Sequence, residues 1–279
     1  DYDYEGSVLS NLIDVLAYNT YYTAFNTNMV VNELFIDSAT LRDNVVAIAK
    51  QLGYTPKSIT SPTAYANFTV NYTNPTSDTE LILKKGTGFI SSYENTLYSY
   101  VTPVDVTAQV SNQTAVFENV RLKEGSFVTT NFTVNSAQKS QRFILDNQSI
   151  DTNTISVKIY PGGGSFNEPY LRADNILTVD PTSKIFFLNE IEDERYELLF
   201  GDGVLGRQLE NNTRIEVTYL VTSGPVSNGV STFVFSGVLE NPTGASPNAF
   251  TVTINNVVPA SGGEDIESVD KIKFNAPLS

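Results

Sequence analysis

Residues 64–73 read AYANFTVNYT, and small or apolar residues alternate there with polar ones. A period of two is typical of a strand with one buried face, and Val, Phe, Tyr and Thr favour strands. Similar segments, separated by Asn, Gly, Pro and Asp, continue to about residue 256: ELILKK, GTGFIS, LYSYVTPVDVTAQV, TAVFENVRL, SFVTTNFTV, RFILD, TISVKIY, NILTVD, KIFFLNEI, RYELLF, RIEVTYLV, TFVFSG and AFTVTINN. Because no helical segment of useful length interrupts them, we expect antiparallel sheets and not a doubly wound parallel sheet.

The residues before this β-rich part have a different pattern. Residues 8–35 carry apolar side chains at helical spacing and contain no Gly or Pro, which predicts a long helix with Ser7 as its N-cap. A second helix is expected at 38–52, with Ser38 as N-cap and Gly53 at its end. The predicted fold class is therefore mainly β, with antiparallel β domains preceded by two α-helices.

Four regions follow from these patterns. They are an N-terminal helical segment at 1–60, a first β-rich region at 61–150, a second at 151–258, and the start of a further helical segment at 259–279. Since the sequence begins without an initiator methionine and stops as the last pattern starts, we expect a piece of a longer protein.

Composition and charge exclude several classes of function. The net charge is −14 and the 17 Lys and Arg residues are scattered, so the surface is expected to repel nucleic acid. The chain has no His and no Cys, which removes Ser-His-Asp triads, thiol nucleophiles and the usual zinc sites. No apolar run approaches the roughly 20 residues of a membrane span. We expect no catalytic residue, no cofactor, no small-molecule substrate and no membrane partner.

Residues 200–206, FGDGVLG, have the G-x-G-x-x-G spacing of a dinucleotide-binding loop. That motif needs a helix after it, and here the next pattern is the strand-like RIEVTYLV. An acid about 20 residues further on is also missing, because Val226, Ser227 and Asn228 stand there. We therefore interpret Gly201, Asp202, Gly203 and Gly206 as a structural turn, in which Gly201 and Gly203 supply positive φ and Asp202 accepts hydrogen bonds from its own backbone.

Two acidic groups are weighed as functional sites. Asp1, Asp3, Glu5 and Gly6 resemble the first half of a calcium loop, but Leu12 stands where the bidentate Glu is needed, so we expect no metal and assign the acids to the helix start. Glu190, Glu192, Asp193 and Glu194 form the densest acidic cluster, from which a glycosidase could draw two carboxylates. Because the cluster lies between two strands, a solvated hairpin loop is the simpler interpretation.

The long helix predicted at 8–35 is apolar on more than one face. A helix packed only on its own domain usually keeps a polar stripe, so the surplus suggests a partner helix. The alternative is that the 38–52 helix and the β region cover these side chains. The candidate interface residues are Leu9, Leu12, Ile13, Leu16, Tyr18, Tyr21, Tyr22, Phe25 and Met29.

Three stretches resemble one family. RYELLFGDGVLGRQL, followed by RIEVTYLVTSG and by SNG at 227–229, resembles the signature stretch of baseplate J-like proteins of contractile-tailed phages. DYDYEGS and LIDVLAYNTYYTAFNTNMVVNELFIDSATLRDNVVAIAKQLGYTPKS resemble the helical entry of T4-type baseplate wedge proteins, and GGEDIESVDKIKFNAPLS is similar to the point where that family leaves its β region. Residues 64–190 resemble the family only in being rich in strands.

The resemblance implies a structural protein of the virion with no catalysis. Its relatives form homodimers, bind other wedge subunits through helices, build the inner baseplate ring around the tail hub and rearrange when the sheath contracts. The expected location is the tail baseplate, assembled in the host bacterial cytoplasm. The alternative is a β-rich adhesin or carbohydrate-binding module, which has no need of two consecutive helices with surplus apolar surface.

Overall fold

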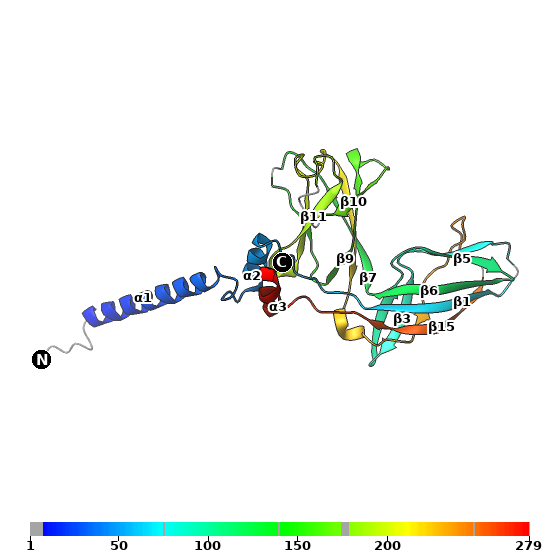
Figure 1. The fold of residues 1–279 in the computed structure, drawn as a ribbon, viewed down its shortest axis with the longest axis horizontal. Coiled ribbons are helices and arrows are strands. Elements are labelled where there is room, and N and C mark those ends of the chain that lie inside the picture. Colours follow the sequence, from blue (N-terminus) through cyan, green and yellow to red (C-terminus); the bar gives the residue numbers. More distant parts are fainter. Residues whose placement is uncertain (1–7, 75, 139, 174–178, 248, 279) are drawn as a thin grey trace. The chain divides into compact units, whose positions relative to one another are not determined.

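The computed structural model of the chain describes residues 8–74, 76–138, 140–173, 179–247 and 249–278 (Figure 1). The chain divides into two compact units. The first, here called the helical unit, combines residues 1–56 with 267–279, and the second, the β unit, comprises residues 57–266. The fold class predicted from the sequence, mainly β with an N-terminal helical segment, is confirmed.

The helical unit contains α1 (Val8–Asn32), α2 (Arg42–Gln51) and α3 (Val269–Asn275), and the 3₁₀ turn η5 (Ala276–Leu278) follows α3. Its core joins the two ends of the chain, because Val45, Val46 and Ala49 of α2 pack with Ile272 and Ala276. The hydroxyl of Tyr54 and the side-chain amide of Asn275 donate to Glu267 Oε1 at 2.7 and 2.8 Å. The helix expected near the end of the sequence is thus part of the same small core as α2.

The predicted N-cap of α2 is wrong. The helix begins at Arg42, and Leu41 occupies the cap position without a side-chain hydrogen bond. Ser38 lies too early in the chain to serve that turn, and its hydroxyl donates to Asn32 O at 2.6 Å. Glu33 instead holds the two residues that precede the helix, since its carboxylate accepts the backbone N–H groups of Thr40 and Leu41 at 2.8 and 3.2 Å.

In the described part of the β unit, the strands form an eight-stranded first sheet and a seven-stranded second sheet. The first sheet contains β1 (Thr63–Tyr72), β2 (Glu80–Leu83), β3 (Gly88–Tyr93), β4 (Thr96–Val101), β5 (Val106–Ser111), β6 (Thr114–Glu124), β14 (Val234–Phe235) and β15 (Phe250–Ser261). The second contains β7 (Ser126–Thr133), β8 (Phe143–Leu145), β9 (Ile150–Tyr160), β10 (Glu168–Arg172), β11 (Ile185–Glu190), β12 (Tyr196–Phe200) and β13 (Arg214–Val221). The short 3₁₀ turns among the described residues of this unit are η1 (Pro161–Gly163), η3 (Glu192–Glu194) and η4 (Gly224–Ser227).

The first sheet follows directly from the alternation in its sequence. Along β1 every second side chain is buried, from Ala64 through Phe68 to Tyr72. The ring of Phe68 stacks on that of Phe117 with 4.7 Å between centroids, and it meets Phe89 edge to face. Burial of such aromatic side chains is the main stabilising contribution to a core of this kind.

The order of strands in the sheets differs from their order in the sequence. The path through the first sheet is β14-β3-β4-β6-β1-β15, with β2 and β5 attached through β6, whereas the second follows β7-β13-β9-β10-β11-β12-β8. The chain therefore leaves the first sheet at Gly125 and returns to it at β14 and β15. The two β-rich regions expected from the sequence, 61–150 and 151–258, divide the strands in their order along the chain, so neither range corresponds to one sheet. All strand pairs are antiparallel among the described residues except β10 with β11, which run parallel.

Two buried carboxylates lie where the first sheet meets the second. Asp151 of β9 accepts the ammonium of Lys123 at 2.7 Å and the backbone N–H groups of Ser61 and Asn153 at 3.2 and 3.1 Å. Glu124, at the end of β6, accepts the hydroxyl of Thr222 and the backbone N–H of Ser223. Charged-group hydrogen bonds of this kind offset the cost of burying a carboxylate, so the junction is held by polar contacts.

Candidate interaction surfaces

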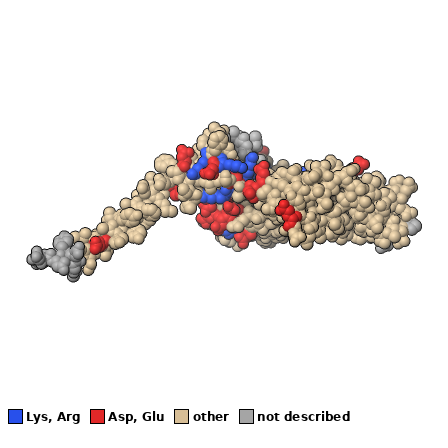
Figure 2. Space-filling model, turned by 90° about the horizontal axis from the view of Figure 1, so that it is seen from below, with Lys and Arg blue, Asp and Glu red and all other residues tan. Residues whose placement is uncertain are grey.

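The interface candidates on α1 are exposed in the structure. From Leu12 to Met29 they are between 45% and 66% exposed: Leu12, Ile13, Leu16, Tyr18, Tyr21, Tyr22, Phe25 and Met29. The side chain of Leu9 lies outside the described residues. Asp14 is the only charged residue of α1, and Figure 2 shows the helix as an almost uncharged stretch. A 25-residue helix in water with this composition has an unusually large apolar surface.

The eight exposed interface candidates of α1 form two stripes on opposite faces, and Val15, Val30 and Val31 are exposed as well. The helix advances about 100° per residue, so Leu12, Ile13 and Leu16 gather on one face, here called the leucine stripe. The aromatic stripe, Tyr18, Tyr21, Tyr22, Phe25 and Met29, is centred about 170° away by the same geometry. No single neighbouring helix can cover both stripes.

The segment 200–206 forms a turn without a following helix. Gly203 and Gly206 have positive φ of 91° and 87°, and the N–H of Gly203 donates to Gly206 O at 3.0 Å. Asp202 Oδ1 accepts the N–H groups of Val204 and Leu205, both at 2.9 Å, and these bonds hold its pKa below the ordinary value. The amides that a phosphate would need are therefore engaged by a side chain of the turn.

One detail of the predicted turn is wrong. Gly201 does not have positive φ; a Cβ at this position would lie 2.1 Å from Gly206 C, so glycine is needed for the close approach of two backbone segments. The strands on either side, β12 and β13, do not pair with each other, because β12 pairs with β11 and β8 while β13 pairs with β7 and β9. The segment is thus a connection across the second sheet.

The acidic cluster lies largely where the sequence predicted. Glu192, Asp193 and Glu194 form the 3₁₀ turn η3 in the hairpin between β11 and β12, while Glu190 is buried at the end of β11. Asp193 Oδ2 accepts a hydrogen bond from Arg195 at 3.4 Å. In the described ranges there is no group of acidic side chains arranged to hold a metal ion, and the possible calcium loop at Asp1–Gly6 lies outside those ranges.

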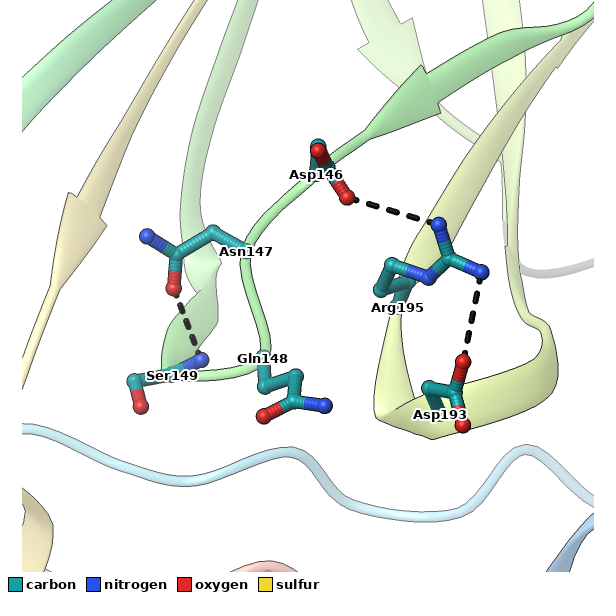
Figure 3. A pocket seen from close by; sticks show the side chains of 6 residues that line it. All are labelled: Asp146, Asn147, Gln148, Ser149, Asp193 and Arg195. Atoms are coloured by element: carbon teal, nitrogen blue, oxygen red, sulfur yellow. Dashed lines mark hydrogen bonds and ion pairs between the residues drawn. The ribbon is translucent and has the colours of Figure 1, made fainter.

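A cavity of about 450 Å³ adjoins this hairpin (Figure 3). Its walls are formed by six polar residues: Asp146, Asn147, Gln148, Ser149, Asp193 and Arg195. Arg195 lies between the two carboxylates and donates to both, at 3.4 Å to Asp146 Oδ1 and 3.4 Å to Asp193 Oδ2. Because Asp146 and Asp193 both bind Arg195, they do not form a free acid–base pair for hydrolysis of a sugar. None of the six side chains is aromatic, so the cavity has no surface on which a sugar ring could stack.

Helices of the described residues are all too short or too polar to cross a membrane.

Two comparisons with known proteins give matches for this chain. Residues 1–54, which include α1 and α2, match the family model described as baseplate wedge protein gp6-like, helical domain. Baseplate wedge protein gp6 of Enterobacteria phage T4 is 28% identical over 291 aligned residues, which cover 98% of this chain and 43% of the relative. The chain thus spans less than half the length of that relative. The resemblance seen in the sequence is confirmed, and the two matches together identify the chain as a relative of the T4-type baseplate wedge proteins.

Proposed function

We propose that the chain is a structural subunit of the baseplate wedge of a contractile phage tail, and that α1 is the helix through which it binds neighbouring wedge proteins. The observation that carries this proposal is the pair of apolar stripes on opposite faces of one helix. The similarity to baseplate wedge protein gp6 supports the structural role in the baseplate, and the match at residues 1–54 lies on the segment that carries the stripes.

Energetics favour a partner on α1. Fully burying a large apolar side chain stabilises by roughly 1.5–3 kcal/mol, and eight such side chains are about half exposed, so covering both stripes is worth on the order of 10 kcal/mol. The loss of freedom on association costs an estimated 4–15 kcal/mol. The free energy gained on α1 therefore yields a stable complex only when most of the apolar surface of this helix is covered. Two helices of the same partner assembly, one on each stripe, meet that condition, because the association cost then arises only once.

The further properties of the proposed subunit rest on the same family relationship. We infer that one copy pairs with a second copy and with other wedge proteins, that these complexes form the inner baseplate ring after assembly in the bacterial cytoplasm, and that the ring rearranges when the sheath contracts. The role is structural and requires no catalysis. The polar cavity of Figure 3 lends no support to the adhesin alternative, since its lining has no aromatic side chain.

Copurification tests this proposal. The chain is coexpressed with the other wedge proteins of its phage, and three double variants are compared: Leu12→Glu with Leu16→Glu, Tyr21→Glu with Phe25→Glu, and, as a control between the stripes, Asn19→Glu with Asn26→Glu. Each stripe variant is expected to weaken recovery of a partner at least about tenfold, because 1.4 kcal/mol corresponds to a factor of ten. Equal recovery with all three variants would contradict the proposal.

A further inference from the structure

A second cavity of about 350 Å³ lies in the β unit and differs from the rest of this acidic chain in its charge. Its lining comes from both sheets: Lys85, Pro103, Arg121, Lys123, Phe127, Asn153 and Thr154. Arg121 and Lys123 are two residues apart on β6, Phe127 belongs to β7, and Asn153 belongs to β9. Three cations and no carboxylate line the cavity, although the chain has 31 acidic residues against 17 basic ones.

Two of the three cations lack a carboxylate partner. Among the described residues Arg121 forms no ion pair. The ammonium of Lys85 lies 4.6 Å from the centroid of the Phe127 ring. The pKa of Lys85 is lowered because its ammonium is partly desolvated and because Lys158 adds a like charge, while Asp105 opposes the shift. In the part of the chain that the structure describes, Lys85 and Arg121 therefore line the cavity without an ion pair of their own, although the nearby Asp105 carboxylate partly offsets the charge of Lys85.

The third cation is fixed in place. Lys123 donates to Asp151 at 2.7 Å, and Asp151 is fully buried and held by the backbone N–H groups of Ser61 and Asn153. The cavity thus has a rigid polar floor at the junction of the sheets. Phe127, over which Lys85 lies, and Pro103 add an apolar wall. Lys123 and Asp151 are already held in place before an anion binds, whereas the exposed side chains of Lys85 and Arg121 have to be ordered by it.

We propose that this cavity binds a carboxylate side chain from an acidic segment of another protein chain. Arg121 supplies a planar donor pair suited to a carboxylate, and Lys85 supplies a second positive charge. A water molecule occupies about 30 Å³, so the volume of the cavity corresponds to on the order of ten water-sized groups. This volume matches a carboxylate side chain together with neighbouring atoms of its peptide better than it matches a single small anion. The chain repels acidic partners elsewhere because of its net charge of −14, so the cavity fixes where such a partner binds.

Isothermal titration at low salt tests the proposal on the full chain, with an acetylated and amidated hexaglutamate peptide as the probe. We expect the peptide to bind and hexaglutamine not to bind. Arg121→Gln and Lys85→Gln are each expected to weaken binding at least about tenfold, the size of one charge-assisted hydrogen-bonded contact. Circular dichroism checks that both variants fold like the wild type.

Lys271→Gln is the matched control, because it removes one exposed positive charge from a residue of the helical unit that is not part of the lining of the cavity. We expect this variant to bind the peptide like the wild type. The proposal is overturned if the peptide does not bind, if hexaglutamine binds equally, if Lys271→Gln weakens binding as much as Arg121→Gln, or if inorganic phosphate binds while the peptide does not. These results do not depend on α1, so they leave the proposed wedge role separately testable.

Discussion

Gly125 joins the two sheets, and its replacement by alanine is expected to destabilise the β unit strongly. It is the single residue between β6 and β7, its φ is 116°, and its N–H donates to Ser99 O at 2.8 Å. A Cβ at this position would lie 2.1 Å from Val221 O and 3.3 Å from Thr222 Cα. Val221 pairs with Ser126 in the sheet, so its backbone cannot move aside without breaking that pairing.

The expected loss combines two contributions. A residue with a side chain held at unfavourable positive φ costs about 1–3 kcal/mol, and forcing an extra methyl group into packed surroundings costs about 1–3 kcal/mol. The sum is about 4 kcal/mol, a large part of the roughly 5–15 kcal/mol by which domains are stable. With a urea dependence of about 2–3 kcal/mol per M, the unfolding midpoint should fall by about 1.5 M.

Urea unfolding followed by tyrosine fluorescence measures this change, because the chain has 15 Tyr and no Trp. Gly244→Ala is the matched control, since Gly244 has φ of 81° but nothing lies within 4 Å of the added Cβ. We expect the control to lose only about 1 kcal/mol, the conformational contribution alone. If both variants shifted the midpoint equally, the close approach to Val221 would have no energetic weight and the reasoning would be refuted.

Three further changes give distinct outcomes. The carboxylate of Glu33 accepts hydrogen bonds from Asn44, Thr40 and Leu41, which lower its pKa from 4.5 to about 2. At pH 7 the helical circular dichroism signal of Glu33→Gln should therefore be lost at a lower urea concentration than that of the wild type. This difference should shrink as the pH falls below 4.5 and vanish near 2, where the carboxylate of the wild type is protonated. Lys123→Met leaves Asp151 buried without its cation and should lower the free energy of unfolding by about 3–5 kcal/mol. Adding Asp151→Asn should recover much of this loss, because the buried charge is then removed. Equal unfolding midpoints for the single and the double variant would count against a stabilising role of this ion pair. Gly203→Ala introduces a side chain at φ of 91° and should lower the free energy of unfolding, measured by urea melts, by about 1 kcal/mol. Calorimetry of the wild type with NAD or ATP should detect no binding. Tight nucleotide binding would show that the turn is a phosphate site.

Local patterns predicted most elements of the fold. The alternation of residues 64–73 gives β1 with its buried face, and the spacing from residue 8 gives α1, although the helix ends at Asn32 instead of Phe35. The strand β10 was missed because Pro169 lies inside it and proline discourages strand assignment. The strand expected in NILTVD lies mostly outside the described residues.

Long-range pairing is what the sequence could not supply. Phe68 of β1 pairs with Ile254 of β15, and no local pattern indicates which distant strand completes a sheet. The same limit applies to the sites. The stripes of α1 are visible from spacing along one helix, whereas the basic cavity draws Lys85, Arg121 and Asn153 from three separate segments that only the folded β unit brings together.

The central proposal is that α1 is covered by helices of other wedge proteins in the baseplate. A cryo-EM map of an intact tail from the phage that encodes the chain tests this most directly. We predict that the chain lies in the baseplate, with Leu12 and Leu16 against one neighbouring helix and Tyr21 and Phe25 against another. A map that places the chain elsewhere in the virion, or that leaves both stripes of α1 in contact with solvent, would contradict the proposal.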